Sequence, residues 1–215
     1  MPDDALIISD PPYNIGYLYL GGYVDSMGED EYIDLFTSFA GRRCVFIHYP
    51  EDTIKYIVPA MGVPKKTVSW VYNSNIGRQH RMVSWYNCRP DLSKVKQPYK
   101  NPKDKRVAAL IDGGSEGTAL YDWWEIDLVK NVSSEKTKYT NQIPERLVSN
   151  IIKTTAHDDD VIIDPFCGSG TTCAVAEKLG FNWAGLDISK IAVATARARV
   201  ADIQNNLFCA ARNAQ

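Results

Sequence analysis

The chain has 215 residues, of which 45% are hydrophobic and 23% are charged, and its formal net charge is −2. This length suits one α/β domain with its own core, and the composition excludes collagen, coiled coil and wholesale disorder. No apolar run approaches the ~20 residues of a membrane span, and Met1-Pro2-Asp3-Asp4 lacks a basic signal region, so we expect a soluble, cytoplasmic protein.

Short apolar runs alternate with amphipathic stretches along the chain, which is typical of strands and helices in turn. We expect strands at residues 5–9, 44–49, 161–166 and 183–187, and helices at 30–40, 52–60, 171–179 and 191–203. Two aromatic-rich runs, 67–72 and 82–86, are expected to pair as strands. A further helix should include Leu147 to Thr155, with Pro144 in its first turn. The order predicts one doubly wound, mostly parallel sheet.

Residues 88–140 are the least periodic part of the chain and contain the pair Trp123-Trp124, so we interpret them as an insertion without a full core. Charge is concentrated nearby. Residues 65–106 hold eleven basic and two acidic residues, a net charge of +9, while the rest of the chain carries −11. Such asymmetry indicates a surface that binds a polyanion. The alternative is an ordinary solvated loop.

The five cysteines are Cys44, Cys88, Cys167, Cys173 and Cys209, with no CxxC pair and no histidine at ligand spacing. This pattern favours reduced thiols and no metal site.

A glycine-containing segment, Asp164-Pro165-Phe166-Cys167-Gly168-Ser169-Gly170-Thr171, lies between a predicted strand and a predicted helix. Glycines at such a turn allow close approach of a ligand, and Asp187, at the end of the next strand, can accept hydrogen bonds from ribose hydroxyls. The third glycine of GxGxxG is replaced by Cys173, and no phosphate loop is present. A nucleoside cofactor without phosphates, such as S-adenosylmethionine, is therefore favoured over a dinucleotide.

The second motif is Asp10-Pro11-Pro12-Tyr13, at the end of the first strand. The two prolines remove N–H donors, which leaves carbonyl oxygens and the Asp10 carboxylate as acceptors around one point. Such acceptors can hold both hydrogens of an exocyclic amino group, while Tyr13 offers a flat face to a base. A proline-terminated strand followed by a loop is the structural alternative.

The two motifs together resemble the S-adenosylmethionine-dependent DNA amino-methyltransferases that modify adenine N6 or cytosine N4. The order of motifs is that of the β class, in which DPPY comes first, a target-recognition region second and the FxGxG cofactor motif last. Here these are residues 10–13, about 88–140 and 166–170. The resemblance covers nearly the whole chain and implies a Rossmann-like methyltransferase fold with an inserted target-recognition region.

The resemblance also implies roles for individual residues. Asp10, Pro11, Pro12 and Tyr13 would be catalytic and hold the target base. The cofactor would be bound by Asp164, Phe166, Cys167, Gly168, Gly170, Thr171 and Asp187. Residues 139–144 are similar to the family's HPTQKP-like segment, which makes Asn141 a candidate for the methionine end of the cofactor. Asn141 and Ile143 depart from the usual Thr and Lys, so a lysine contact to the cofactor carboxylate is not expected.

DNA binding requires phosphate contacts, because rotating a paired base out of the duplex costs energy. The candidate DNA-binding residues are Arg78, Arg81, Arg89, Lys94, Lys96 and Lys100, with the arginines suited to guanine edges. Trp70 and Trp85 are expected to pack in the core.

The resemblance implies transfer of a methyl group to adenine N6 in a specific DNA sequence, because many cytosine-N4 enzymes carry Ser where Asp10 stands. A cytosine-N4 enzyme is the alternative. An RNA or protein methyltransferase and a non-catalytic DNA-binding relic are less favoured. A restriction-modification context and a homodimer are compatible with the resemblance.

Overall fold

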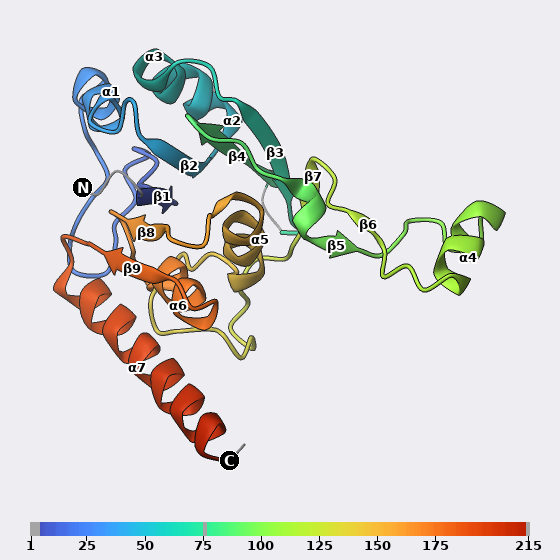
Figure 1. Ribbon diagram of the computed structural model, residues 1–215. Helices are drawn as coiled ribbons and strands as arrows, with labels where there is room; N and C mark the ends of the chain where they lie inside the picture. Colours follow the sequence, from blue (N-terminus) through green and yellow to red (C-terminus); the bar gives the residue numbers. More distant parts are fainter. Residues whose placement is uncertain (1–4, 75–76, 214–215) are drawn as a thin grey trace.

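A seven-stranded sheet forms the centre of the computed structural model, which describes residues 5–74 and 77–213 (Figure 1). The strand order is β7-β3-β4-β2-β1-β8-β9. Parallel pairs join β2 (Arg43–His48) to β1 (Ala5–Ser9), β1 to β8 (Val161–Asp164), and β8 to β9 (Asn182–Gly185). Met1 to Asp4 and the thiol of Cys209 lie outside what the structure describes.

The remaining strands extend the sheet beyond β2. Strand β4 (His80–Tyr86) is antiparallel to both β2 and β3 (Lys66–Val71), and β7 (Trp123–Glu125) is parallel to β3. The expected pairing of the two aromatic-rich runs is confirmed by this β3–β4 pair. The expected mostly parallel sheet is confirmed as well.

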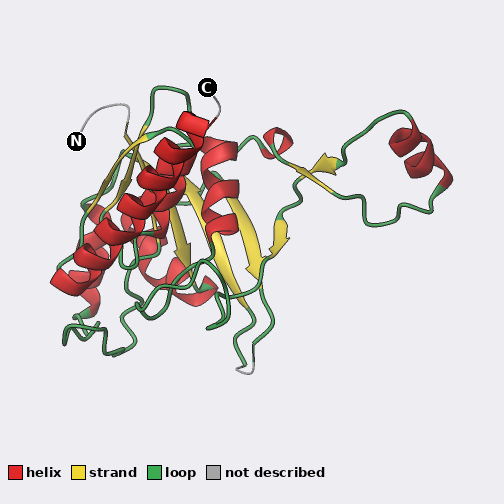
Figure 2. Cartoon of the chain, turned by 90° about the horizontal axis from the view of Figure 1, so that it is seen from below, coloured by secondary structure: helices red, strands yellow, loops and turns green. Residues whose placement is uncertain are grey.

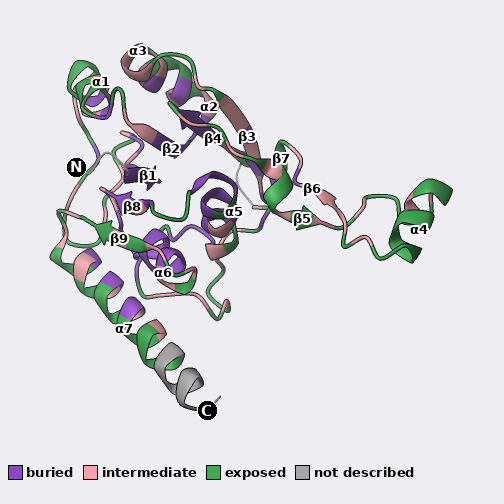
Figure 3. Ribbon diagram, viewed as in Figure 1, coloured by how far each residue is buried: buried purple, intermediate pink, exposed green. Residues whose placement is uncertain are grey.

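Helices cover both faces of the sheet, as in a doubly wound fold. On one face, α1 (Glu29–Thr37) packs Tyr32 and Phe36 against Ile7 and Phe46. On the other face, α5 (Glu145–Thr155) and α6 (Thr171–Lys178) pack against alternate residues of β1, including Leu6. Because alternate residues of a strand point to opposite faces, the fully buried β1 contributes apolar residues to both cores (Figure 3). Helix α7 (Lys190–Asn213) packs on α6 (Figure 2).

Two helical segments differ from their sequence-based predictions. The helix expected at 52–60 consists of α2 (Pro50–Asp52), the π-helical turn η1 (Thr53–Ile57) and α3 (Val58–Met61). Pro59 cannot donate a backbone hydrogen bond, and a wider turn accommodates that gap. Helix α5 begins at Glu145, so Pro144 is its N-cap residue, with extended backbone, and not part of its first turn.

The middle of the chain forms an arm that extends away from the sheet (Figures 1 and 2). It contains η2 (Leu92–Lys94), the short antiparallel pair of β5 (Lys96–Gln97) and β6 (Thr118–Ala119), and α4 (Lys105–Asp112) between them. No residue of α4 is buried. Strand β7, although it lies within residues 88–140, belongs to the main sheet, because Trp124 is buried in the core.

Within the described residues, none of the helices combines the length and apolar character needed to cross a membrane.

Candidate active site

The two sequence motifs follow neighbouring strands. Strands β1 and β8 pair in parallel, with Ile7 opposite Ile163, so both end at the same edge of the sheet. The Ser9 hydroxyl at the end of β1 donates a hydrogen bond of 2.6 Å to Oδ1 of Asp164 at the end of β8. The two strands are neighbours, and their pairing brings residues 10–13 and 164–170 to one edge although 153 residues separate Asp10 from Asp164 in the chain.

Asp10 lies just beyond the end of β1, and its side chain is only 17% exposed. Burial raises the pKa of the Asp10 carboxyl, because a charged group loses solvation in the interior. Two neighbours act in the opposite direction. Nη1 of Arg81 lies 3.6 Å from Asp10 Oδ2, and the Tyr13 hydroxyl donates to Asp10 Oδ1. Both carboxylate oxygens therefore face a donor.

The guanidinium of Arg81 lies among aromatic rings at this edge. Its Cζ atom is 5.0 Å from the centroid of the Tyr13 ring, 5.4 Å from that of Tyr49 and 5.2 Å from that of Trp70. Cations at such distances from ring faces are attracted by the ring quadrupole. The Arg81 side chain is 15% exposed, and its buried Nε atom has no hydrogen-bond partner among the described residues. Arg81 thus approaches both the carboxylate of Asp10 and a face of Tyr13.

The two prolines present unequal acceptors. The carbonyl oxygen of Pro12 accepts a hydrogen bond of 2.5 Å from the Tyr32 hydroxyl of α1. The carbonyl oxygen of Pro11 accepts no hydrogen bond from the described residues. Of the acceptors expected from the sequence, the Asp10 carboxylate and the Pro11 carbonyl are the pair with capacity for an external amino group.

His48, at the end of β2, is fully buried behind Tyr13, with the two ring centroids 5.3 Å apart. Neither ring nitrogen has a hydrogen-bond partner in the described part of the chain. Burial, followed by the charge of Arg81, lowers the pKa of His48 to about 3, so the imidazole is neutral. His48 supports the Tyr13 ring from below and carries no charge into the site.

The glycine turn after β8 has the backbone freedom that the sequence predicts. Gly168 and Gly170 have φ values of 49° and 74°, in the left-handed region that favours glycine. A Cβ atom on Gly170 would lie 2.6 Å from Cβ of Ala196 in α7, which permits only glycine at this contact. The turn therefore presents bare backbone on one side and supports α7 on the other.

Asp187, which follows the next strand, β9, holds this turn in place by hydrogen bonds. Its Oδ2 accepts from the backbone N–H of Gly168 at 2.9 Å, and its Oδ1 accepts from Ser189 N–H at 2.8 Å. The sequence predicts a ribose contact for Asp187, whereas the structure shows this carboxylate holding two loops. Each carboxylate oxygen retains a second acceptor site, so a ribose contact stays a prediction.

The turn also has a cover that fits a nucleoside. The Tyr139 ring lies over Gly168, 3.3 Å from where a Cβ would stand, and the hydroxyl oxygen of Thr140 is buried without a hydrogen-bond partner among residues 5–74 and 77–213. An unpaired buried hydroxyl beside bare backbone offers a polar contact to a bound cofactor. Asn141 is exposed and has a φ of 54°. Among the described residues, no cluster of His, Cys, Asp or Glu suits a metal ion.

Asp164 and two thiols form the floor below the turn. Burial raises the pKa of Asp164 to about 6, against the lowering effect of its hydrogen bonds, which include those from Ser9 and from the Phe166 backbone. Cys167 and Cys173 are buried side by side, and their mutual hydrogen bond, followed by burial, raises the pKa of the Cys173 thiol. A Cβ on Gly185 would meet Cys173 Sγ at 2.5 Å. The Cys173 thiol is therefore protonated, and both cysteines pack against Gly185 of β9.

The predicted DNA-binding residues are placed in different surroundings. Arg81 lies inside the site, and Arg78 is next to it, with Cζ 4.4 Å from the Tyr49 ring centroid. Arg89 and Lys96 are exposed. Lys94 donates to the carbonyl oxygen of Ala156 at 3.4 Å, and Lys100 lies over two aromatic rings of the arm's base.

Sequence reasoning missed Tyr49, Tyr139 and Tyr32 as site residues, and it placed Arg81 on a DNA-facing surface. Tyr49 directly follows the apolar strand β2, which is the same signal that located Asp10 after β1. Strand-end position was thus a usable sign for Tyr49. Tyr139 lies outside regular secondary structure, and its sign was its place in the cofactor-associated segment 139–144, from which only Asn141 was selected.

Comparisons with known proteins agree with this geometry. The family model N6_N4_Mtase, described as DNA methylase, matches residues 5–198. The type II methyltransferase M2.DpnII of Streptococcus pneumoniae is 38% identical over 91% of this chain and 81% of its own length. The DNA adenine methyltransferase YhdJ of Escherichia coli is 28% identical over 86% of this chain and 71% of its own. The type II methyltransferase M.BglII of Bacillus subtilis is 25% identical over 88% of this chain, which spans only 62% of that relative.

Solved structures show the same fold. A crystal structure of an M1.HpyAVI–SAM complex superimposes with a TM-score of 0.61 at 22% identity, covering 91% of this chain and 88% of the other. The cytosine-N4-specific PvuII DNA methyltransferase gives a TM-score of 0.63 at 15% identity, covering 92% and 79%. The expected Rossmann-like methyltransferase architecture is confirmed.

Proposed function

Because the chain belongs to the N6/N4 family of DNA methylases, we propose that it transfers a methyl group from S-adenosylmethionine to the exocyclic amino group of a base in DNA. The observation that carries this proposal is the meeting of an acceptor pair, Asp10 and Pro11, with a bare glycine turn on the neighbouring strand. The acceptor pair suits the amino group, and the glycine turn suits a nucleoside.

The residues at the end of β1 orient the reacting nitrogen. The Asp10 carboxylate and the Pro11 carbonyl accept the two N–H bonds of the amino group, which turns its lone pair away from the ring. Tyr13 supports the base with its ring, and His48 holds that ring from behind. Because burial raises the pKa of Asp10, this carboxylate also accepts a proton more readily than an exposed one.

The cofactor cradle is formed by the turn after β8. Gly168 and Gly170 give close backbone approach, Tyr139 and Thr140 cover the turn, and Asp187 fixes it. S-adenosylmethionine supplies an electrophilic methyl group when it is bound. Phe166, Cys167 and Thr171 shape the same turn, and Asn141 is the outermost candidate contact.

Adenine N6 is the base we favour over cytosine N4. The support is the Asp at position 10 and the similarity to YhdJ, whose name states adenine. The fold itself does not discriminate, because the cytosine-N4-specific PvuII enzyme superimposes equally well.

DNA is the proposed macromolecular substrate, with the target base rotated out of the duplex into the site. Residues 88–140 are the proposed recognition region, and the exposed cations Arg89 and Lys96 are proposed phosphate contacts, together with Arg78 beside the site. A homodimer stays a prediction, which sedimentation analysis would test.

The test combines a substitution with identification of the product. Asp10→Ala is expected to bind S-adenosylmethionine like the unmodified protein but to lose at least ~100-fold in methyl transfer, because the nitrogen is no longer oriented. Asp10→Asn, which keeps one carbonyl acceptor, should lose less. Labelled cofactor and nucleoside analysis of the DNA measure both rate and product. N6-methyladenine supports the proposal, and N4-methylcytosine would assign the alternative. Near-normal activity of Asp10→Ala would contradict the role of Asp10.

A further inference from the structure

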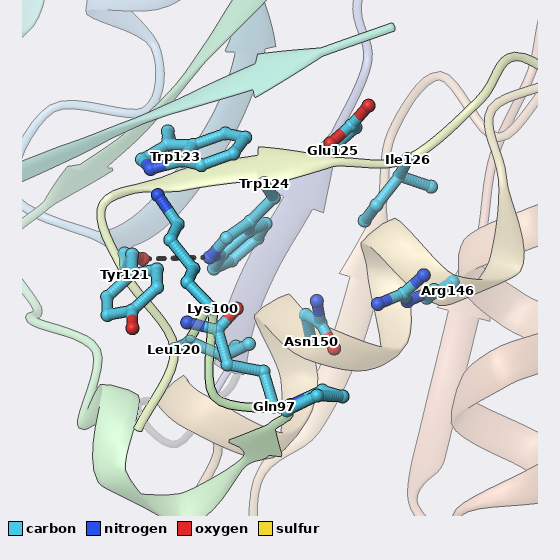
Figure 4. A pocket seen from close by; sticks show the side chains of 11 residues that line it. Gln97, Lys100, Leu120, Tyr121, Trp123, Trp124, Glu125, Ile126, Arg146 and Asn150 are labelled. Carbon is cyan, nitrogen blue, oxygen red and sulfur yellow. Dashed lines mark hydrogen bonds between the residues drawn. The ribbon is translucent and has the colours of Figure 1, made fainter. Parts of the chain in front are cut away.

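A pocket of about 220 Å³ lies apart from the active site, where the base of the arm meets the outer strand of the sheet (Figure 4). Its walls come from residues on both sides of the β5–β6 pair, from β7 and from the first turns of α5. Four steps of the strand order separate β7 from β1, and neighbouring strands lie ~4.8 Å apart, so the pocket is roughly 19 Å from Asp10. The pocket is therefore distinct from the target-base site.

The wall of this pocket includes a cation held over two rings. The Lys100 ammonium lies 4.1 Å from the centroid of Trp123 and 4.9 Å from that of Tyr121. Trp123 is 37% exposed, whereas its neighbour Trp124 is buried and donates through Nε1 to the Tyr121 carbonyl at 3.0 Å. Trp124 thus anchors β7 in the core, whereas Trp123 is partly exposed and has the Lys100 ammonium over its ring, so a ligand ring would stack on Trp123 beside or in place of that ammonium.

The side-chain amide of Asn150 lines the same space. Asn150 of α5 is only 7% exposed, and its side chain makes no hydrogen bond with the described residues. Figure 4 shows it projecting from α5 toward the hollow between Trp124 and Gln97. An amide in a pocket wall offers both a donor and an acceptor to a ligand. Asn amides match the paired donor and acceptor on the edge of a nucleobase.

The charge of the wall favours an anionic ligand. Lys100 and Arg146 both line the pocket, and neither forms an ion pair with the described residues. Glu125 is the acidic lining residue. The volume is below the ~300–1,000 Å³ of pockets that enclose drug-sized ligands, which fits a single heterocycle.

We propose that this pocket binds a second, unstacked nucleobase of the DNA substrate, outside the target base. The ring stacks on Trp123, the Asn150 amide pairs with the base edge, and Lys100 and Arg146 contact the adjoining phosphates. This inference rests on the proposed function, because it takes its ligand from the same DNA strand.

The experiment measures binding of a fluorescently labelled oligonucleotide by anisotropy, at fixed salt and without cofactor. Trp123→Leu keeps apolar bulk but no ring, and it should weaken binding roughly tenfold, the order expected when one base loses its stacking partner. Trp123→Phe keeps a flat ring and should restore most of the affinity. Lys100→Ala should also weaken binding, whereas Lys130→Ala, an exposed lysine paired with Asp127, is the matched charge control.

An oligonucleotide with abasic positions separates stacking from charge. On abasic DNA, Trp123→Leu should bind like the unmodified protein, while Lys100→Ala should remain weaker. Equal affinity of Trp123→Leu and the unmodified protein for intact DNA would overturn the proposal, as would an equal loss on abasic DNA. Failure of the unmodified protein to bind or methylate any DNA would instead refute the proposed function. Normal methyl transfer by a protein indifferent to Trp123→Leu would refute the pocket alone.

Discussion

Asp10 combines two properties that normally oppose each other, deep burial and use as an acceptor of hydrogen bonds. Burial raises the pKa of the carboxyl and so favours its protonated form, which offers fewer acceptor sites. Arg81 resolves the conflict from β4, since its guanidinium lies 3.6 Å from the carboxylate and is always charged. The arginine thus opposes the effect of burial on the pKa of Asp10 and favours its ionised form.

Replacement of Arg81 should therefore act through pH. In Arg81→Met the pKa of Asp10 rises further, because the opposing cation is gone while burial remains. The ionised fraction at neutral pH falls, so methyl transfer slows at pH 7 and recovers as pH is raised. The acid limb of the pH–rate profile should therefore move to higher pH. Arg81→Lys keeps the charge and should stay near the original profile. An unmoved limb in Arg81→Met would show that Arg81 does not control Asp10.

The sequence predicts the main residues of the candidate active site but not all of the side chains that contact them. Asp10 and Gly168 follow apolar runs that are visible in the sequence, so their place at strand ends was predictable. Arg81 lies inside a strand, opposite Trp70, and its approach to Asp10 depends on β4 lying next to β2 and β2 next to β1. That strand order depends on packing between segments far apart in the chain, and a local sequence pattern does not predict it.

Among the elements, the turn between β8 and α6 tolerates substitution least, because Gly170 lies in it. Gly170 caps α6 with a left-handed backbone, and its missing side chain admits Ala196 of α7 at close range. Gly170 is thus the N-cap of α6 and also allows α7 to pack closely against the turn. A functional turn and a structural contact are built from one position.

Substitution of this glycine should cost more than backbone strain alone. Gly180, after α6, also has a positive φ of 79°, but a Cβ there would meet nothing within 4 Å. Gly180→Ala therefore measures strain, about 1–3 kcal/mol. Gly170→Ala adds a clash with the α7 backbone and should lose about 1–3 kcal/mol more. Denaturant unfolding gives both values, and cofactor titration should show weaker binding for Gly170→Ala only. An equal loss of unfolding free energy in Gly170→Ala and Gly180→Ala would mean that α7 moves away from the added methyl group without loss of stability.

Element prediction succeeded where periodicity is strong and failed where contacts are sparse. The runs at 5–9 and 161–166 are apolar on every side, as strands covered on both faces must be. The two-residue strands β5 and β6 are too short to leave a pattern. Helix α4 has an apolar side in its sequence, but the structure leaves Leu110 and Ile111 of that side exposed. Helix α7 ends at Asn213, ten residues beyond the predicted end at 203.

The whole molecule consists of a body, which is the sheet with a core on each face, and a basic arm that contains β5, α4 and β6. Gln97 and Thr118 are register partners in the β5–β6 pair, so the arm leaves and re-enters the body at one point. Residues 98–117 include Lys100, Lys103, Lys105 and Arg106. Stability should therefore reside in the body, and affinity for DNA should depend on the arm.

Excision tests this separation. Replacing residues 98–117 with an Asn-Gly turn joins Gln97 to Thr118 in a two-residue hairpin. The melting temperature should change little, because α4 has no buried residue. DNA binding should weaken, and the slope of log affinity against log salt should flatten by ~0.9 for each phosphate that the protein no longer neutralises. Alanine at the four cations should reproduce the flatter slope in the intact arm. A large drop in thermal stability would place part of the core in the arm.

The central position of β1 also has a consequence for synthesis of the chain. One side of this strand pairs with β2, which follows closely, but the other side pairs with Val161 to Ile163. A growing polypeptide therefore carries an unpaired apolar strand edge until β8 has left the ribosome, and such edges invite association between chains. Nascent or prematurely terminated products should need chaperone protection, and no partially active intermediate can form before β8 emerges.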